Sequence, residues 1–303
     1  MSVIVEDLTR VYGHQKAVDG ISFEAKKGQV LGFLGPNGAG KSTTMKIITC
    51  FIPQTSGKVD VCGLDASEHP GEVRQKIGYL PEHNPLYKDM YVKEFLHFLC
   101  RVHKLDNPRR RIAEIIEMTG LPKEQHKIIG TLSKGYRQRV GLAQAMIHDP
   151  EVLILDEPTT GLDPNQLQEI RGLIKTISRD KTVILSTHIM QEVQAVCDTV
   201  VILNEGKIVA DAPISELVTM SRGQKKISLE IKENIHPEKL LAGLSGVTSV
   251  APIGKNKWQV HAADDIRSKI FELAVQQKWT LLTLYQDHNT VEDVFQLLTK
   301  ASK

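Results

Sequence analysis

The sequence lacks the features of several protein classes. No run of about 18 apolar residues occurs in the 303-residue chain, so we expect no transmembrane helix. The first residues include acidic side chains and no apolar stretch of signal length, so we expect no secretory signal. The four cysteines are far apart and form no C-x-x-C pair, which favours reduced thiols over a disulfide framework or a zinc site. These absences together favour a cytosolic protein.

The chain also has no surplus of either charge. It carries 38 basic and 36 acidic residues, for a net charge of +2. We therefore predict no nucleic-acid partner, because such binding requires a strongly basic face. The one basic run, Arg109–Arg111, follows a proline at the start of an expected helix, and we interpret it as a solvated face.

The most informative segment is a glycine-rich loop. Gly35 to Ser42 read GPNGAGKS and directly follow the apolar run Val30–Leu34. This spacing, between a strand and a helix, is typical of the phosphate-binding loop. Its glycines let backbone N–H groups point at phosphate oxygens, while Lys41 adds charge for the β- and γ-phosphates and Ser42 offers a hydroxyl to Mg²⁺. The helix that follows presents its positive N-terminus to the same anion.

We therefore predict a nucleotide-binding site at this loop. The predicted phosphate-contacting residues are Gly35, Pro36, Asn37, Gly38, Ala39, Gly40, Lys41, Ser42 and Thr43.

Two carboxylates follow a second apolar strand, Val152–Leu155. Ligands of parallel sheets gather at the carboxyl ends of strands, so Asp156 can reach Mg²⁺ and Glu157 can polarise a water that attacks the γ-phosphate. His188 follows the apolar run TVILST and can donate a hydrogen bond to the γ-phosphate or to that water. We predict Lys41, Glu157 and His188 as the catalytic residues.

The pattern of apolar runs divides the chain into two domains, residues 1–220 and 221–303. The first mixes short apolar strands with amphipathic helices, which predicts an α/β fold with a parallel sheet and an antiparallel N-terminal portion. The expected strands are Val3–Val5, Ile21–Ala25, Val30–Leu34, Lys58–Val61, Ile77–Leu80, Val152–Leu155, Val183–Ser186, Val200–Leu203 and Ile208–Asp211. The expected helices are Lys41–Cys50, Val92–His103, Arg109–Thr119, Gly135–Ile147 and Pro164–Ile177.

A polar, aperiodic segment, Thr219–Lys226, reads as the linker between the two domains. Beyond it we expect the order strand, helix, strand, strand, helix, strand, with an additional final helix. This is the order of a small ferredoxin-like α+β domain. The expected strands are Lys226–Ile231, Val247–Pro252, Lys257–His261 and Thr280–Tyr285, and the expected helices are Pro237–Ala242, Ile266–Gln277 and Thr290–Leu298.

Taken in order, the motifs of residues 1 to about 220 resemble the ATPase subunit of an ATP-binding cassette (ABC) transporter. Walker A is Gly35–Thr43, Walker B ends at Asp156 with Glu157 after it, and His188 stands at the switch histidine. The resemblance implies a P-loop NTPase fold with a RecA-like core, an antiparallel β subdomain and a helical subdomain. It also implies ATP and Mg²⁺ as ligands.

The resemblance assigns further residues. Tyr12 matches the aromatic residue that stacks on adenine, and Asp163 belongs to the D-loop. The signature motif consists of Leu132, Ser133, Lys134, Gly135 and Tyr136, and Ser133 also reads as a helix N-cap. The family usually has L-S-G-G-Q there, so Lys134 and Tyr136 depart from the pattern, whereas Ser133 and Gly135 retain it.

A second departure is Glu82, in the segment GYLPE, where the family usually has glutamine. The resemblance implies that this residue touches Mg²⁺, together with Ser42 and Asp156, and links ATP to the membrane subunit. The G-Y-L-P-E form resembles the ATPases of ABC-2 exporters. Within that branch the chain is most similar to gliding-motility-associated ATP-binding subunits of bacteria.

The family resemblance also implies a mechanism with partners. Two cassettes, here a homodimer, pack head to tail, so that each ATP lies between the Walker A loop of one and the signature of the other. Closure is passed to integral membrane permease subunits, which places the chain in the cytoplasm on the inner face of the cell membrane. Segment 83–95 is partly apolar and either receives the permease or forms a local core under a loop. The competing functions are a soluble, non-transport ABC ATPase and a regulatory subunit with little hydrolysis.

Overall fold

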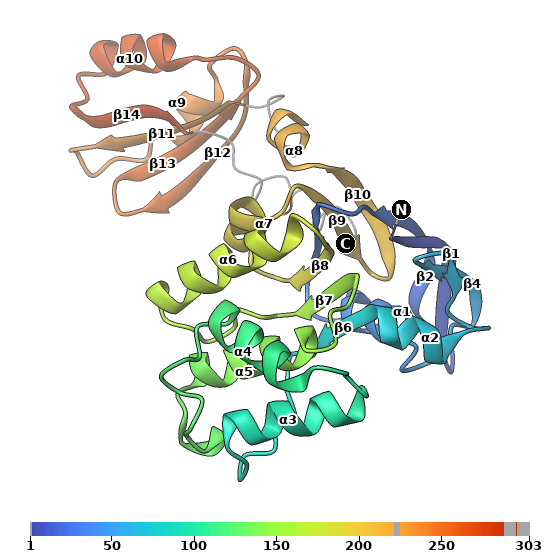
Figure 1. Ribbon diagram of the computed structural model, residues 1–303. Coiled ribbons are helices and arrows are strands. Elements are labelled where there is room, and N and C mark those ends of the chain that lie inside the picture. The colour runs from blue at the N-terminus through green and yellow to red at the C-terminus, as the bar shows by residue number, and fades with distance from the viewer. Residues whose placement is uncertain (1, 221–224, 288–294, 296–303) are drawn as a thin grey trace. The chain divides into compact units, whose positions relative to one another are not determined.

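The computed structural model describes residues 2–220, 225–287 and 295 (Figure 1). It divides the chain into two compact units, residues 1–214 and 215–303. In the part of the chain that is described, no helix is long and apolar enough to cross a membrane.

A six-stranded sheet in the first unit has the order β10-β9-β3-β8-β7-β6, and all neighbouring strands are parallel except the pair β10 and β9. Every residue of β3, β7 and β8 is buried, as expected for strands that are covered on both faces. The strands are β3 (Val30–Leu34), β6 (Ile77–Leu80), β7 (Val152–Asp156), β8 (Thr182–Thr187), β9 (Thr199–Asn204) and β10 (Lys207–Pro213).

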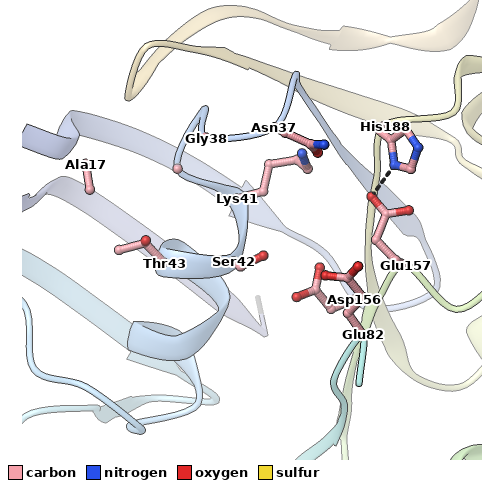
Figure 2. A pocket seen from close by; sticks show the side chains of 11 residues that line it. Ala17, Asn37, Gly38, Lys41, Ser42, Thr43, Glu82, Asp156, Glu157 and His188 are labelled. Atoms are coloured by element: carbon pink, nitrogen blue, oxygen red, sulfur yellow. Dashed lines mark hydrogen bonds and ion pairs between the residues drawn. The ribbon is translucent and has the colours of Figure 1, made fainter. Parts of the chain in front are cut away.

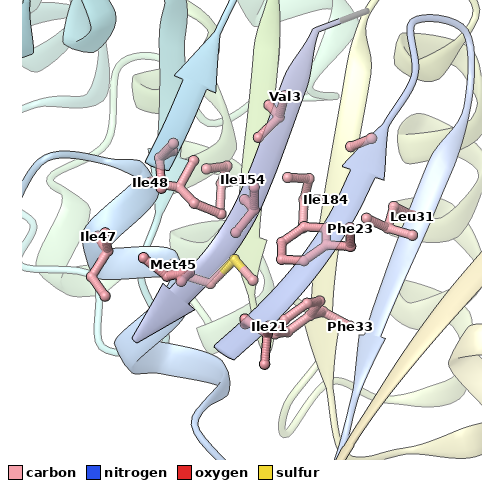
Figure 3. Packing of buried hydrophobic residues seen from close by; sticks show 14 of the residues in the cluster. Val3, Ile21, Phe23, Leu31, Phe33, Met45, Ile47, Ile48, Ile154 and Ile184 are labelled. Carbon is pink, nitrogen blue, oxygen red and sulfur yellow. The ribbon is translucent and has the colours of Figure 1, made fainter. Parts of the chain in front are cut away.

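A four-stranded antiparallel sheet, order β2-β1-β4-β5, contributes to the same hydrophobic core (Figure 3). Phe23 of this sheet contacts Phe33 of the parallel sheet, with ring centroids 5.1 Å apart. The strands are β1 (Val3–Tyr12), β2 (Gln15–Ala25), β4 (Ser56–Val61) and β5 (Leu64–Asp65). Strands β1 and β2 are longer than expected. The additional residues, 6–12 of β1 and 15–20 of β2, mix apolar and polar side chains, so they form no continuous apolar run that would indicate a strand.

The helices of the first unit follow the expected order with small shifts of their ends. Helix α1 ends at Ile48 and not at Cys50, because Cys50 adopts the left-handed region at φ +55°. The sequence patterns missed α2 and α7, which have seven residues each. The helices are α1 (Lys41–Ile48), α2 (Pro70–Lys76), α3 (Val92–Val102), α4 (Pro108–Met118), the 3-10 helix η1 (Ile129–Thr131), α5 (Lys134–Met146), α6 (Pro164–Ser178) and α7 (Met190–Val196).

The interpretation of Arg109–Arg111 as a solvated face is wrong for Arg111. Arg109 and Arg110 are exposed, but the Arg111 guanidinium donates hydrogen bonds to the carbonyls of Met146 and Ile147, at 2.6 and 2.9 Å. These carbonyls lie at the C-terminal end of α5, where helical carbonyls have no partner within the helix. Arg111 therefore ties α4 to the end of α5.

The second unit has a four-stranded antiparallel sheet of order β12-β13-β11-β14. The chain order strand, helix, strand, strand, helix, strand confirms the expected ferredoxin-like arrangement. Its own core includes Trp258, Ile227 and Ile270. The elements are β11 (Lys225–Ile231), α9 (Glu238–Ala242), β12 (Val247–Gly254), β13 (Lys257–Ala262), α10 (Arg267–Gln276) and β14 (Leu281–Asp287).

The predicted linker Thr219–Lys226 is wrong at both ends. Helix α8 (Ile214–Met220) includes its first two residues, and β11 begins at Lys225. The expected final helix, Thr290–Leu298, lies outside the range described in the structure, apart from the single residue Phe295.

Candidate functional site

The glycine-rich loop has a backbone that only glycine adopts easily. Gly38 and Gly40 have φ values of +82° and +107°. A Cβ on Gly40 would lie 2.5 Å from the carbonyl oxygen of Ala17, so no larger residue fits there. Helix α1 begins at Lys41 with no side-chain cap, and the N–H groups of its first turn therefore remain for a ligand.

A single pocket gathers side chains that are far apart in the sequence (Figure 2). They come from β2, the glycine-rich loop, α1, the last residue of β7 and the segments that follow β6, β7 and β8. The lining residues are Ala17, Asn37, Gly38, Gly40, Lys41, Ser42, Thr43, Glu82, Asp156, Glu157 and His188. The parallel sheet thus brings the ends of its strands to the loop, as expected for such sheets.

Lys41 is buried at the start of α1. Its Nζ donates hydrogen bonds to the carbonyl oxygens of Gly35 and Pro36, at 2.7 and 3.2 Å. Burial lowers the pKa of Lys41, although the nearby carboxylates of Glu157, Asp156 and Glu82 favour its charged form.

Glu157 and His188 form a close pair. His188 Nδ1 lies 2.7 Å from Glu157 Oε1 (Figure 2). The Glu157 N–H donates to the carbonyl of Ser186 at 2.9 Å. Glu157 has φ +52°, a region that a residue with a Cβ rarely adopts. This conformation lets the chain turn directly after β7 and holds the Glu157 carboxylate beside His188 at the pocket, and strained backbone of this kind clusters at active sites.

A set of oxygen donors beside Glu157 fits a hard cation. The Ser42 hydroxyl and the carboxylates of Asp156 and Glu82 lie close together in Figure 2. Burial raises the pKa of Asp156, and the charges of Glu157 and Glu82 raise it further, whereas the neighbouring Ser186 and Ser42 hydroxyls lower it. Oxygen ligands crowded with negative charge are those that Mg²⁺ takes in proteins, so these residues fit the ion.

Other predicted site residues lie outside the pocket. Gly35, Pro36 and Ala39 belong to the loop but do not line the cavity. Tyr12, at the end of β1, is 47% exposed, and its ring lies under the Arg10 guanidinium at 4.7 Å. Its role in adenine stacking stays a prediction.

The signature residues 132–136 and Asp163 do not line the pocket either. The Ser133 side chain accepts a hydrogen bond from the N–H of Tyr136 at 3.4 Å, so it caps α5 as predicted. Asp163 caps α6 by accepting from the N–H groups of Asn165 and Gln166, at 3.0 and 2.9 Å. In this chain the signature and the D-loop lie next to each other, because the Lys134 side chain lies against Gly161, and Gly135 packs against Gln166 of α6.

Sequence reasoning missed Ala17, which is part of the pocket wall. Nothing in the hairpin sequence indicates this role. It follows from the close approach of the Ala17 carbonyl to Gly40, which only the folded chain reveals.

Comparisons with known proteins agree with this geometry. The family described as ABC transporter matches residues 18–160. The bacitracin transport ATP-binding protein BcrA of Bacillus licheniformis is 31% identical over 299 residues, which cover 97% of each chain. The chain belongs to the ATP-binding subunits of ABC transporters.

Two further relatives support the assignment. The linearmycin resistance ATP-binding protein LnrL of Bacillus subtilis is 36% identical over 229 residues, 75% of this chain and 74% of LnrL. The structure of cbiO1 from Clostridium perfringens, part of the ABC transporter complex cbiONQ, is similar at a TM-score of 0.66 and 29% identity, covering 72% of this chain and 90% of cbiO1. The predicted α/β cassette fold is thereby confirmed, and the chain is an ABC cassette with a P-loop nucleotide-binding fold.

Proposed function

We propose that this cassette hydrolyses ATP and thereby powers a membrane exporter of the ABC-2 type. The observation that carries the proposal is the Glu157–His188 pair, which faces the glycine-rich loop and Lys41 across one pocket. In this proposal the loop and Lys41 bind the β- and γ-phosphates, Glu157 orients and polarises the attacking water, and His188 donates to the γ-phosphate.

Each of these groups has a separate task in the proposed reaction. Lys41 leaves the carbonyl of Gly35 and donates to phosphate oxygens, which offer it a stronger, charge-assisted acceptor. Ser42, Asp156 and Glu82 would hold Mg²⁺, which supplies positive charge against the charge that develops on the phosphates. The His188 ring holds the Glu157 carboxylate at the pocket through the contact between His188 Nδ1 and Glu157 Oε1, which are 2.7 Å apart.

We further propose that two copies form each complete site. Ser133 and Gly135 do not line the pocket of their own chain, and Gly135 is packed against Gln166. A second cassette, placed head to tail, would bring its Ser133 to the γ-phosphate of the first, with Asp163 between the two. This arrangement accounts for a signature helix that is capped and ordered without contacting its own pocket.

The export role is supported by the relatives and by one surface. BcrA is described as a bacitracin transport protein and LnrL as a linearmycin resistance protein. In segment 83–95, Tyr87 and Tyr91 are each at least half exposed, although the Tyr87 ring also packs edge-on against Phe95 and Phe98. We propose that this segment receives the permease, on the inner face of the cell membrane.

Purification of the chain from its native host in mild detergent tests the export role. We expect a membrane protein with several transmembrane helices to co-purify in near-equal amount. Recovery with ribosomes, with repair factors or alone would contradict the exporter and favour a soluble ABC ATPase.

A further inference from the structure

Glu192 is a buried carboxylate that no motif of the sequence includes. It lies in α7, directly after the His188 loop, and is only 1% exposed. Within the described residues no lysine or arginine forms an ion pair with it. A buried carboxylate is costly unless hydrogen-bond donors satisfy both of its oxygens.

Two threonine hydroxyls satisfy those oxygens. Thr159 donates to Oε1 of Glu192, and Thr187 donates to Oε2 at 3.1 Å. Both threonines are buried. The Thr187 hydroxyl also accepts a hydrogen bond from the N–H of Ile189 at 3.1 Å, so its single proton is directed to Glu192.

The two threonines lie next to the catalytic residues in the sequence. Thr159 stands two residues after Glu157, and Thr187 stands one residue before His188. The interactions therefore close a ring: Glu157 contacts His188, the chain leads from His188 to Thr187, and Glu192 joins Thr187 to Thr159 and so back to Glu157. We call Glu192, Thr159 and Thr187 the Glu192 bridge.

We propose that Glu192 is a positioning residue that fixes the Glu157 loop and the His188 loop to each other. The inference rests on the proposed hydrolysis and assigns it a residue beyond those that line the pocket. Glu157 is held at φ +52°, a conformation that persists only where surrounding contacts determine it. Thr159 also lies in the loop that leads to Asp163, so the bridge connects the proposed dimer contact to the catalytic pair.

Two substitutions separate positioning from a general structural role. Glu192→Met keeps the length of the side chain and removes both acceptors. Glu192→Gln keeps one acceptor, and its amide can donate to the Thr159 hydroxyl, which is free to rotate. Glu124→Met is the matched control, because Glu124 is also a buried glutamate, bound to Lys127 and outside the pocket.

The first measurement is steady-state ATP hydrolysis and ATP binding by the full chain. We expect Glu192→Met to lower kcat by at least about 10-fold and to change the ATP dissociation constant by less than about twofold, because misplaced catalytic groups slow chemistry without removing the phosphate loop. Glu192→Gln should recover most of the lost rate, and Glu124→Met should keep the rate of the unaltered chain. A Glu192→Met rate within about twofold of the unaltered chain would overturn the inference. So would equal losses of rate and ATP binding.

The second measurement does not depend on turnover. Hydrogen–deuterium exchange of the nucleotide-free chain should rise in Glu192→Met at both loops, 157–163 and 186–190, and stay unchanged for Glu124→Met. Unchanged exchange at both loops would disprove the bridge. If exchange rises while the unaltered chain shows no hydrolysis above Glu157→Gln, the proposed function fails and the bridge stands.

Discussion

The glycine-rich loop and the signature loop each lead directly into a helix, and the two are built differently. The glycine-rich loop enters α1 through Gly40 at φ +107°, with no side-chain cap, and carries a buried Lys41. The signature loop enters α5 through Ser133, which caps the helix, and carries an exposed Lys134.

The N-terminus of α1 has N–H groups without a side-chain partner that a ligand can bind, whereas the N-terminus of α5 already has a side-chain cap. The uncapped N–H groups of α1 need an acceptor, and they face a pocket with carboxylates on its far side. At α5 the Ser133 side chain supplies one acceptor within the chain. We infer that the first junction binds the nucleotide within one chain, whereas the second acts on the nucleotide of a partner. Five substitutions test this comparison.

The largest effect is expected at the pocket of the first junction. Glu157→Gln should lower ATP turnover by at least about 10²-fold and leave ATP binding intact, because it removes the base but not the phosphate contacts. Steady-state hydrolysis and equilibrium ATP binding measure the two effects. Near-normal turnover would remove Glu157 from its proposed role.

A matched pair of lysine substitutions compares the two junctions directly. Lys41→Ala should weaken ATP binding by about 10-fold or more, the scale of a lost hydrogen bond between charged groups. Lys134→Ala should leave ATP binding by the single chain unchanged, because Lys134 does not line the pocket. Equal losses for both variants in a filter-binding titration would erase the proposed distinction.

A smaller effect is expected from the cap of the second junction. Ser133→Ala removes the side-chain cap of α5, which costs about 1 kcal/mol. For a unit of this size the melting temperature should fall by about 2–4 °C, measured by differential scanning calorimetry. ATP binding by the isolated cassette should not change. A loss of ATP binding as large as that of Lys41→Ala would mean that Ser133 acts within its own chain.

The smallest effect on hydrolysis is expected at Glu82. Glu82→Gln keeps an oxygen that can ligate Mg²⁺, so ATP turnover should stay within about twofold. Because Glu82 precedes the proposed permease surface, the same change should alter the coupling of hydrolysis to transport in reconstituted vesicles. A collapse of hydrolysis would instead identify the Glu82 charge as required.

The sequence predicted the glycine-rich loop and the strand before Asp156 because both signals are local. A fixed spacing and a short apolar run identify them without knowledge of their neighbours. Helix α7 could not be found in this way, because its seven residues are too few for a helical period. Glu192 reads there as an ordinary surface acid, and its partner Thr159 is 33 residues away in the sequence.

Two other features were not predicted because they also depend on contacts between segments that are distant in the sequence. The composition of the run Arg109–Arg111 predicts that all three side chains are exposed to solvent. Arg111 instead binds the C-terminal end of α5, a helix that begins 23 residues later, at Lys134. The contribution of Ala17 to the pocket depends on one backbone contact with Gly40. Contacts of this kind depend on the three-dimensional meeting of segments, so no local pattern carries them.

Helix α5 lies between the signature motif and the strand that carries Asp156. It is 13 residues long, or about 20 Å, with Ser133 at one end and the carbonyls held by Arg111 at the other. Five residues, 147–151, separate α5 from β7, which ends at Asp156 and is followed by Glu157. In the proposed dimer the signature end of α5 serves one ATP, and the far end of β7 serves the other. The continuous segment α5–β7 would then connect the two ATP sites, and we expect ATP turnover by the dimer to be cooperative.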